Sequence, residues 1–240
     1  MSVSIIQNVA GTNNFGAATE FTAFGSNNAS GNTIVALLYF TPTDGSAPLT
    51  PSFSDTKGNS YSIISSTFKN TPGSFSGLNI GCLIAYATGI AAGANTVTVT
   101  FSGPSNYAIL CLFELSPCTL DKATGAISAT VTANPSAGSL SLSGTGEFAA
   151  AIAVVDDGVG SPGLFTAGTG WTIQLNNGGG ADSEGTEYRV GASGTITGDF
   201  VKGSGNWVAA VAAFSDNSGA TPFIDECSPI QFGFQNSPIL

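Results

Sequence analysis

The chain has 240 residues, of which 42% are hydrophobic and only 8% charged, and this length is enough to bury at least one large core. Fifteen acidic residues against five basic ones give a formal net charge of −10, which repels polyanions and argues against nucleic acid as a partner. The chain contains no histidine. Ser-His-Asp and Cys-His catalysis are therefore excluded, and we expect no enzyme, no metal and no cofactor.

Residues 1–11 contain neither a basic region nor an apolar run of signal-peptide length, and no segment approaches a membrane span. We therefore expect neither Sec-dependent export nor a membrane partner. Gly, Ser, Thr and Asn supply most of the polarity, as in proteins that face the outside. Together these features predict a virion protein assembled in the host cytoplasm; the alternative is an extracellular or cell-surface protein that leaves by a leaderless route.

Thr, Val, Ile and Phe dominate between Gly-rich breaks, a pattern that predicts β-strands rather than helices. Four runs are apolar on both faces and are expected to be central strands, covered on both sides. They are Thr33 to Phe40, Tyr107 to Leu115, Phe148 to Val155 and Trp207 to Phe214. The last two are rich in Ala, but their shortness and their Val and Phe residues favour strand over helix.

Other segments alternate with period 2, which predicts one buried and one wet face. The segment 96–101 places three threonines on one side and Val97, Val99 and Phe101 on the other. The segment 139–143 repeats the pattern, and Trp171, Ile173 and Leu175 alternate with polar residues. The segment 55–59, Asp-Thr-Lys-Gly-Asn, predicts a hairpin turn in which Gly58 or Asn59 takes a positive φ.

The order of these segments in residues 1–118 is replayed in residues 119–215, which predicts an internal quasi-duplication inside one domain, 1–215. The short stretch 117–127 between the copies does not look like a linker. The fold expected is all-β, a jelly-roll-like antiparallel β-sandwich with an internal quasi-duplication.

Residues 216–240 differ in character: a polar hinge leads into an apolar, Pro-containing arm. Prolines disfavour a helix or a central strand there. The arm must cover either its own sandwich or a neighbouring subunit. Its apolar residues are Phe223, Ile224, Ile230, Phe232, Phe234, Ile239 and Leu240.

Four cysteines do not make a disulfide framework. Cys82 and Cys111 lie in apolar runs, where a free thiol behaves as a small hydrophobe. Cys118 and Cys227 lie in Pro-containing connections and form the one plausible disulfide pair.

Five carboxylates are the candidates for a glycosidase pair: Glu114, Asp156, Asp157, Glu184 and Glu187. Glu184 and Glu187 are three apart and should point to opposite faces of a strand. For Glu114 we favour a strand-end carboxylate that reaches solvent or a backbone donor. Asp156 and Asp157 precede Gly158 and favour a turn, with only a weak case for calcium.

Two sets of residues suggest ligand binding. Trp171, Tyr188 and Trp207 resemble a sugar-stacking platform, although core packing is the default for large rings in strands. The Gly-rich loop 176–182 adds polar side chains at a loop tip. The weakly predicted ligand set is Trp171, Asn177, Asp182 and Tyr188.

Three segments, 55–61, 165–172 and 206–214, carry a family resemblance. From about Gly31 to Phe214 the chain resembles poorly characterised jelly-roll-like β-sandwich domains of bacteriophage structural proteins and bacterial surface proteins. The resemblance implies a sandwich without a shared active site. The leading hypothesis is thus a non-enzymatic structural virion protein, a capsid decoration (cement) protein or a tail or fibre component, that binds copies of itself or other virion proteins. The alternative is a carbohydrate-binding or adhesive surface module with a glycan partner.

Overall fold

The computed structural model describes residues 2–12, 16–42, 49–72, 79–158, 164–178 and 182–216. These residues form fourteen β-strands and one short 3-10 turn, which confirms the all-β class. The elements are β1 (Ile5–Val9), β2 (Thr19–Ala23), β3 (Thr33–Pro42), β4 (Pro51–Asp55), β5 (Ser62–Ile63), η1 (Ser65–Thr67), β6 (Lys69–Pro72), β7 (Asn79–Thr88), β8 (Thr96–Phe101), β9 (Ser105–Leu115), β10 (Cys118–Thr132), β11 (Ser136–Asp156), β12 (Thr172–Gly178), β13 (Asp182–Asp199) and β14 (Gly205–Asp216).

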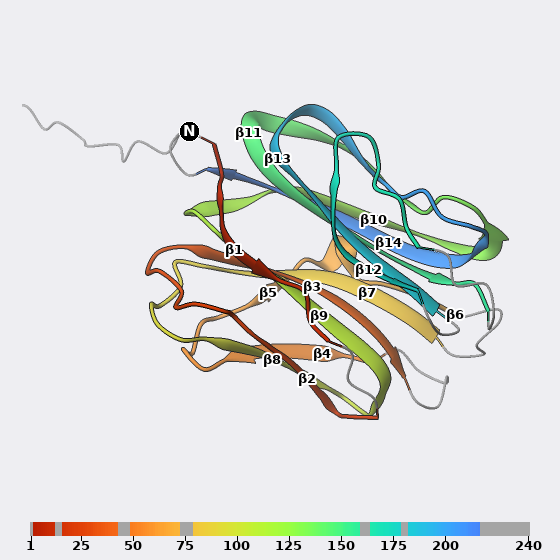
Figure 1. Ribbon diagram of the computed structural model, residues 1–240, viewed down its shortest axis with the longest axis horizontal. Helices are drawn as coiled ribbons and strands as arrows, with labels where there is room; N and C mark the ends of the chain where they lie inside the picture. Colours follow the sequence, from red (N-terminus) through yellow and green to blue (C-terminus); the bar gives the residue numbers. More distant parts are fainter. Residues whose placement is uncertain are drawn as a thin grey trace, which may run out of the picture.

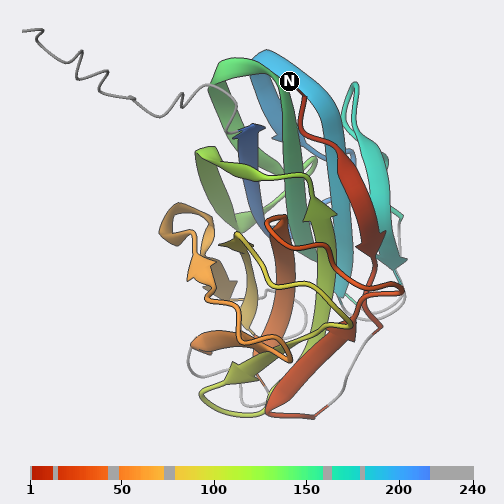
Figure 2. The same ribbon diagram turned by 90° about the vertical axis from the view of Figure 1, so that its left-hand side faces the viewer.

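The strands form three antiparallel sheets that are stacked in layers (Figure 1). The small sheet has the order β2-β8-β4, the middle sheet β1-β9-β3-β7-β5 with β6 also paired to β7, and the upper sheet β10-β14-β11-β13-β12. The view turned by 90° shows the same succession of layers (Figure 2). The molecule is therefore a layered antiparallel β-sandwich; the jelly-roll connectivity stays a prediction.

Each of the four long apolar runs lies inside a central strand, as the sequence predicts. β3 and β9 are neighbours in the middle sheet, and β11 and β14 are neighbours in the upper sheet. Because both sheets are covered on both faces, successive side chains along the four apolar runs are nearly all buried. The Ala-rich runs 148–155 and 207–214 are strands, as predicted; they pair with each other and their small side chains are buried.

Three apolar clusters separate the layers. Odd-numbered side chains of β3 such as Leu37 pack between the middle and upper sheets, and even-numbered ones such as Leu38 pack against the small sheet. A third cluster covers the outer face of the upper sheet, where Ala151 and Val211 contact Phe165, Trp171 and other rings. The alternation predicted for 96–101 is confirmed, because Val97, Val99 and Phe101 are buried beneath a more exposed threonine row.

The two large sheets repeat one topology. With β6 of the middle sheet left aside, each sheet has five strands, and the first along the chain pairs with the fifth, the fifth with the second, the second with the fourth and the fourth with the third. Beyond the upper sheet the outer layer is built from the continuous strands β11 and β13. β11 and β13 pass through bulges near Thr145 and Glu147, and their far ends pair again as Leu140 opposite Ile196. The boundaries 1–118 and 119–215 stay predictions.

Three local expectations are corrected by the structure. A bulge between Ile173 and Leu175 reverses the side-chain alternation, so Ile173 packs on the outer cluster and Leu175 between the sheets. The turn at 55–59 does have Gly58 at φ +72°, but it is not a hairpin, because β4 pairs with β8 and β5 pairs with β7.

The third correction concerns residues 117–127. Cys118 is not in a connection: it is the buried first residue of β10, which pairs with β14 up to Asp216. Cys82 and Cys111 are buried free thiols, as predicted. Cys227 and the apolar residues of the arm from Phe223 to Leu240 lie outside the described residues, so the disulfide and the arm stay predictions. Over the described ranges, no helix has the length and apolar character needed to cross a membrane.

Candidate functional site

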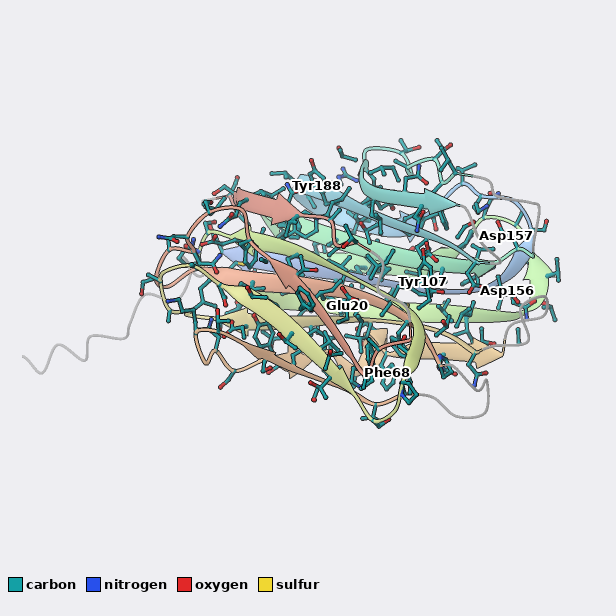
Figure 3. All side chains as sticks on the ribbon, turned by 60° about the horizontal axis from the view of Figure 1, so that its bottom comes forward. Glu20, Phe68, Tyr107, Asp156, Asp157 and Tyr188 are labelled. Atoms are coloured by element: carbon teal, nitrogen blue, oxygen red, sulfur yellow. The ribbon has the colours of Figure 1, made fainter. Side chains whose placement is uncertain are left out.

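The structure does not bring the four predicted ligand residues together. Trp171 lies on the outer face of the upper sheet and Tyr188 packs on the opposite face, against Phe113 with ring centroids 5.4 Å apart. Asn177 and Asp182 flank the tip between β12 and β13. Figure 3 shows Tyr188 near the middle of the molecule's length, whereas Asp156, the strand partner of Asp182, lies towards one end. Trp207 is also buried, so the core placement favoured for these rings holds.

A cleft of about 350 Å³ opens on the outer face of the upper sheet. Its walls are the loop before β12 on one side and the far half of β13 on the other. The lining residues are Gly168, Thr169, Trp171, Arg189, Thr195, Ile196, Thr197, Asp199 and Val201. Within the described residues, neither the Arg189 guanidinium nor the Asp199 carboxylate forms an ion pair or a side-chain hydrogen bond. The cleft thus offers one donor-only and one acceptor-only group.

The walls of this cleft are tied together by hydrogen bonds. The Trp171 indole N–H donates to the Thr197 carbonyl at 3.0 Å, and the Gly168 amide donates to Oε2 of Glu187 at 2.9 Å. A side chain at Gly168 would meet the Asp199 carbonyl, since a Cβ there would lie 2.4 Å from that oxygen. Burial raises the pKa of Glu187 to about 8, so at neutral pH this carboxyl is mostly protonated beneath the cleft.

A second polar cluster lies between the middle and upper sheets, near the tip of β13. The Tyr39 hydroxyl donates to Oδ2 of Asp182 at 3.0 Å, and Asn177 donates to the Tyr107 hydroxyl at 2.6 Å. Asp156 is the direct strand partner of Asp182. These contacts join strands from both sheets at one edge of the apolar core.

Burial dominates the electrostatics of this inter-sheet cluster. It raises the pKa of Asp182 to about 7, with a further contribution from the Asp156 charge. It also raises the pKa of Glu184 well above the ordinary value of 4.5, with the Asp182 charge adding to the effect. Burial also raises the pKa of the neighbouring tyrosines, Tyr39 and Tyr107, and that of Tyr107 rises to about 12. The cluster is therefore most stable with part of its carboxyl groups protonated.

Glu114 is fully buried, and hydrogen bonds engage both of its oxygens. Oε1 accepts from the Ala29 amide at 2.8 Å and from Asn32 at 2.7 Å, while Oε2 accepts from Gln7 at 2.6 Å and from Asn28 at 2.7 Å. These donors lower the pKa of Glu114 against the opposing effect of burial. The backbone donor that the sequence predicted is the Ala29 amide. The predicted contact of Glu114 with solvent is not found, because the side chain is buried. The carboxylate thus holds the loop before β3 in place.

The remaining carboxylate candidates are also buried. Asp157 forms a buried ion pair with Lys202, whose ammonium lies 5.7 Å from the centre of the Phe165 ring. The strand partner of Glu184 is Val154 in the inter-sheet cluster, and that of Glu187 is Ala151 in the outer cluster. The prediction that the two glutamates point to opposite faces is confirmed. Among the described residues, no three or more acidic or cysteine side chains gather closely enough to hold a metal ion.

The exposed face of the small sheet carries no charged residue. Phe21 on β2 lies directly opposite Thr98, which lies opposite Ser54 on β4. The Phe21 side chain is 60% exposed, the second highest value among the large apolar residues of the described chain. The other residues of this face are small or carry hydroxyls: Thr19, Ala23, Ser52, Ser54, Thr96, Thr98 and Thr100.

Sequence reasoning missed Arg189 and Asp199. Arg189 is the sole arginine of the chain and directly follows Tyr188, a residue of the predicted ligand set. This position was the one signal in the sequence that could have indicated Arg189. Asp199 lies ten residues further along the same strand, and only the bend of β13 brings it to the same cleft.

Comparison with known proteins gives no match for this chain: no family model, no curated protein and no solved structure resembles it significantly.

Proposed function

We propose that this protein is a non-enzymatic structural component of a virion, a capsid decoration protein or a tail or fibre part, that assembles with copies of itself or with other particle proteins. The uncharged face of the small sheet carries this proposal. Interface cores are depleted in charge and enriched in aromatic residues, and Phe21 stands exposed among hydroxyl-bearing neighbours on that face. Burying such a face requires the desolvation of no ion.

The size of the face indicates that a second contact is needed. Three strands of about five residues span roughly 17 Å by 14 Å, or about 240 Å². A stable interface buries about 800 Å² on each partner. The predicted apolar arm 216–240 begins at the last residue of β14 and carries three phenylalanines among its apolar residues. In the proposal this segment supplies the additional contact by docking on a neighbouring subunit.

The use of the carboxylates supports a non-enzymatic role. Glu114 is saturated by hydrogen bonds and Asp157 is held by Lys202. Glu184 and Glu187 lie on opposite faces of one strand. Glu114 and Asp157 are thereby engaged within the fold, and Glu184 and Glu187 are not placed as a pair that flanks a substrate.

Solution mass tests the proposal. Light scattering after gel filtration should show an assembly for the full chain, and Phe21→Ser or a Phe232→Ser, Phe234→Ser double variant should reduce its mass. Val190→Thr is the matched control, because Val190 is 50% exposed but belongs to the upper sheet. A full chain that stays monomeric alone and with purified particles, or variants that assemble like the control, would refute the proposal.

The cleft beside Trp171 favours a second candidate function, a carbohydrate-binding or adhesive module. It combines a partly buried cation, a carboxylate and threonine hydroxyls in a concave site, as small polar ligands require. Such an activity is compatible with a place on the outside of a particle.

A further inference from the structure

We propose that the cleft between the loop 168–171 and β13 binds a neutral saccharide ring through Arg189 and Asp199. The inference deepens the second candidate function and does not depend on assembly. It assigns residues that the sequence did not single out. Of the predicted ligand set, it retains only Trp171.

The argument begins with the hydrogen-bonding capacity of the two charged groups. Arginine only donates and a carboxylate only accepts, and within the described chain neither group is engaged by another side chain. Adjacent hydroxyls of a sugar both donate and accept, so one ring satisfies both groups at once. Thr195 adds a hydroxyl that acts in either sense, whereas the Thr197 hydroxyl already shares a hydrogen bond with that of Ser139, at 3.0 Å.

Charge decides between neutral and acidic sugars. Asp199 faces the same cleft as Arg189, and the chain carries a net charge of −10. An anionic ligand would gain from the guanidinium but would be repelled by the Asp199 carboxylate and by the overall field. A neutral ring is repelled neither by the Asp199 carboxylate nor by the overall field.

Size and shape restrict the ligand further. A volume of about 350 Å³ lies at the small end of the range for ligand sites, about 300–1,000 Å³, which favours a single ring. Trp171 is 8% exposed and its indole N–H is already bonded to Thr197, so it forms a wall rather than a stacking platform. Val201, which is half exposed, offers an apolar surface for the C–H groups of the ring.

The cleft is formed before any ligand arrives. Glu187 holds the Gly168 amide from beneath and Trp171 links the loop to β13. Gly170 adopts φ +82° beside Arg189, a conformation that suits glycine. A preformed site lowers the ordering cost of binding. Glu187 is therefore a positioning residue of the site, not a ligand contact.

Titration calorimetry with the full chain tests the inference, using glucose, galactose, mannose and N-acetylglucosamine as neutral probes and glucuronic acid as the acidic probe. At least one neutral sugar should bind, and Arg189→Gln and Asp199→Asn should each weaken it about tenfold or more. Lys122→Gln and Asp121→Asn are matched controls outside the cleft and should bind normally. Unchanged urea midpoints establish that the variants are folded.

Three outcomes would overturn the inference, and they are distinguishable. Binding of a sugar that survives both cleft variants would leave the carbohydrate-binding function standing but place it elsewhere. Preference for glucuronic acid over every neutral sugar would make the ligand anionic. Binding of none of the probes would remove both the site and the second candidate function, while leaving the assembly proposal untouched.

Discussion

The ammonium of Lys202 and the carboxylate of Asp157 form an ion pair that is almost completely buried. Breaking such a pair leaves an uncompensated charge in the interior, which costs about 3–5 kcal/mol. We therefore expect Lys202→Met to lower the free energy of unfolding by about this amount, measured by urea unfolding. Lys122→Met is the control, because the Lys122 side chain is about half exposed near Asp121 and its loss should cost less than about 1 kcal/mol. If Lys202→Met and Lys122→Met lowered the free energy of unfolding equally, the stabilising role of the buried Lys202–Asp157 pair would be contradicted.

Glu114 should be irreplaceable even by its amide. Glu114→Gln would turn an NH₂ group towards donors such as Asn28 and Asn32, and we expect a loss of at least about 2 kcal/mol in urea unfolding. The pKa of Glu114 is lowered in the folded state. Its contribution is thus present above the ordinary value of 4.5 and is lost as the pH falls through the folded pKa.

Glu147→Gln is the matched comparison, since the Glu147 carboxylate accepts from the Gly144 amide while burial raises its pKa. A Glu114→Gln protein as stable as wild type at neutral pH would show that the four hydrogen bonds are not needed.

Stability should fall as the pH rises from mildly acidic to alkaline. Burial raises the pKa of Glu20 and Asp182 to about 7 and that of Glu187 to about 8. Between about pH 4.5 and pH 8 the folded protein therefore holds protons that the unfolded chain has released, so its stability decreases with pH. The urea midpoint should be higher at about pH 5 than at about pH 9.

Glu187→Gln provides the internal check on this pH dependence, because it removes one of the raised groups and should make the decline shallower. A midpoint that rises towards alkaline pH, or a slope unchanged in Glu187→Gln, would contradict the burial of these acids.

Gly185 should tolerate no side chain. A Cβ at this position in β13 would lie 2.8 Å from the Phe165 ring, and Phe165 is itself packed against Phe200. We expect Gly185→Ala to destabilise the protein by about 1–3 kcal/mol through overpacking. At Gly203 a Cβ would meet nothing within 4 Å, so Gly203→Ala should stay within about 0.5 kcal/mol. Thermal unfolding of the two variants side by side decides the matter.

Periodicity was sufficient to predict the central strands. The segment 33–40 and its counterparts are apolar at nearly every position, and this pattern identifies strands that are covered on both faces. The alternation at 96–101 likewise identified a strand with one buried face and one more exposed face. Short edge strands such as β1 and β2 were missed, because five residues carry too little pattern to stand out.

The positions of bends and of candidate site residues could not be predicted in the same way. The bulge between Ile173 and Leu175 leaves no mark on the hydrophobic pattern, although it sends the two side chains to different clusters. Arg189 and Asp199 line the same cleft only because β13 continues across its bulges into the outer layer. The burial of Glu114 depends on Asn28 and Asn32, more than eighty residues away in sequence.

The central claim is that this chain is a structural part of a virion, and its presence in particles is the most direct test. Quantitative mass spectrometry should be applied to density-gradient-purified particles from the cells in which the chain is naturally produced. The account predicts that the protein bands with the particles in a fixed ratio to their other structural proteins. A protein found only in the soluble fraction, with none in the particle band, would contradict it.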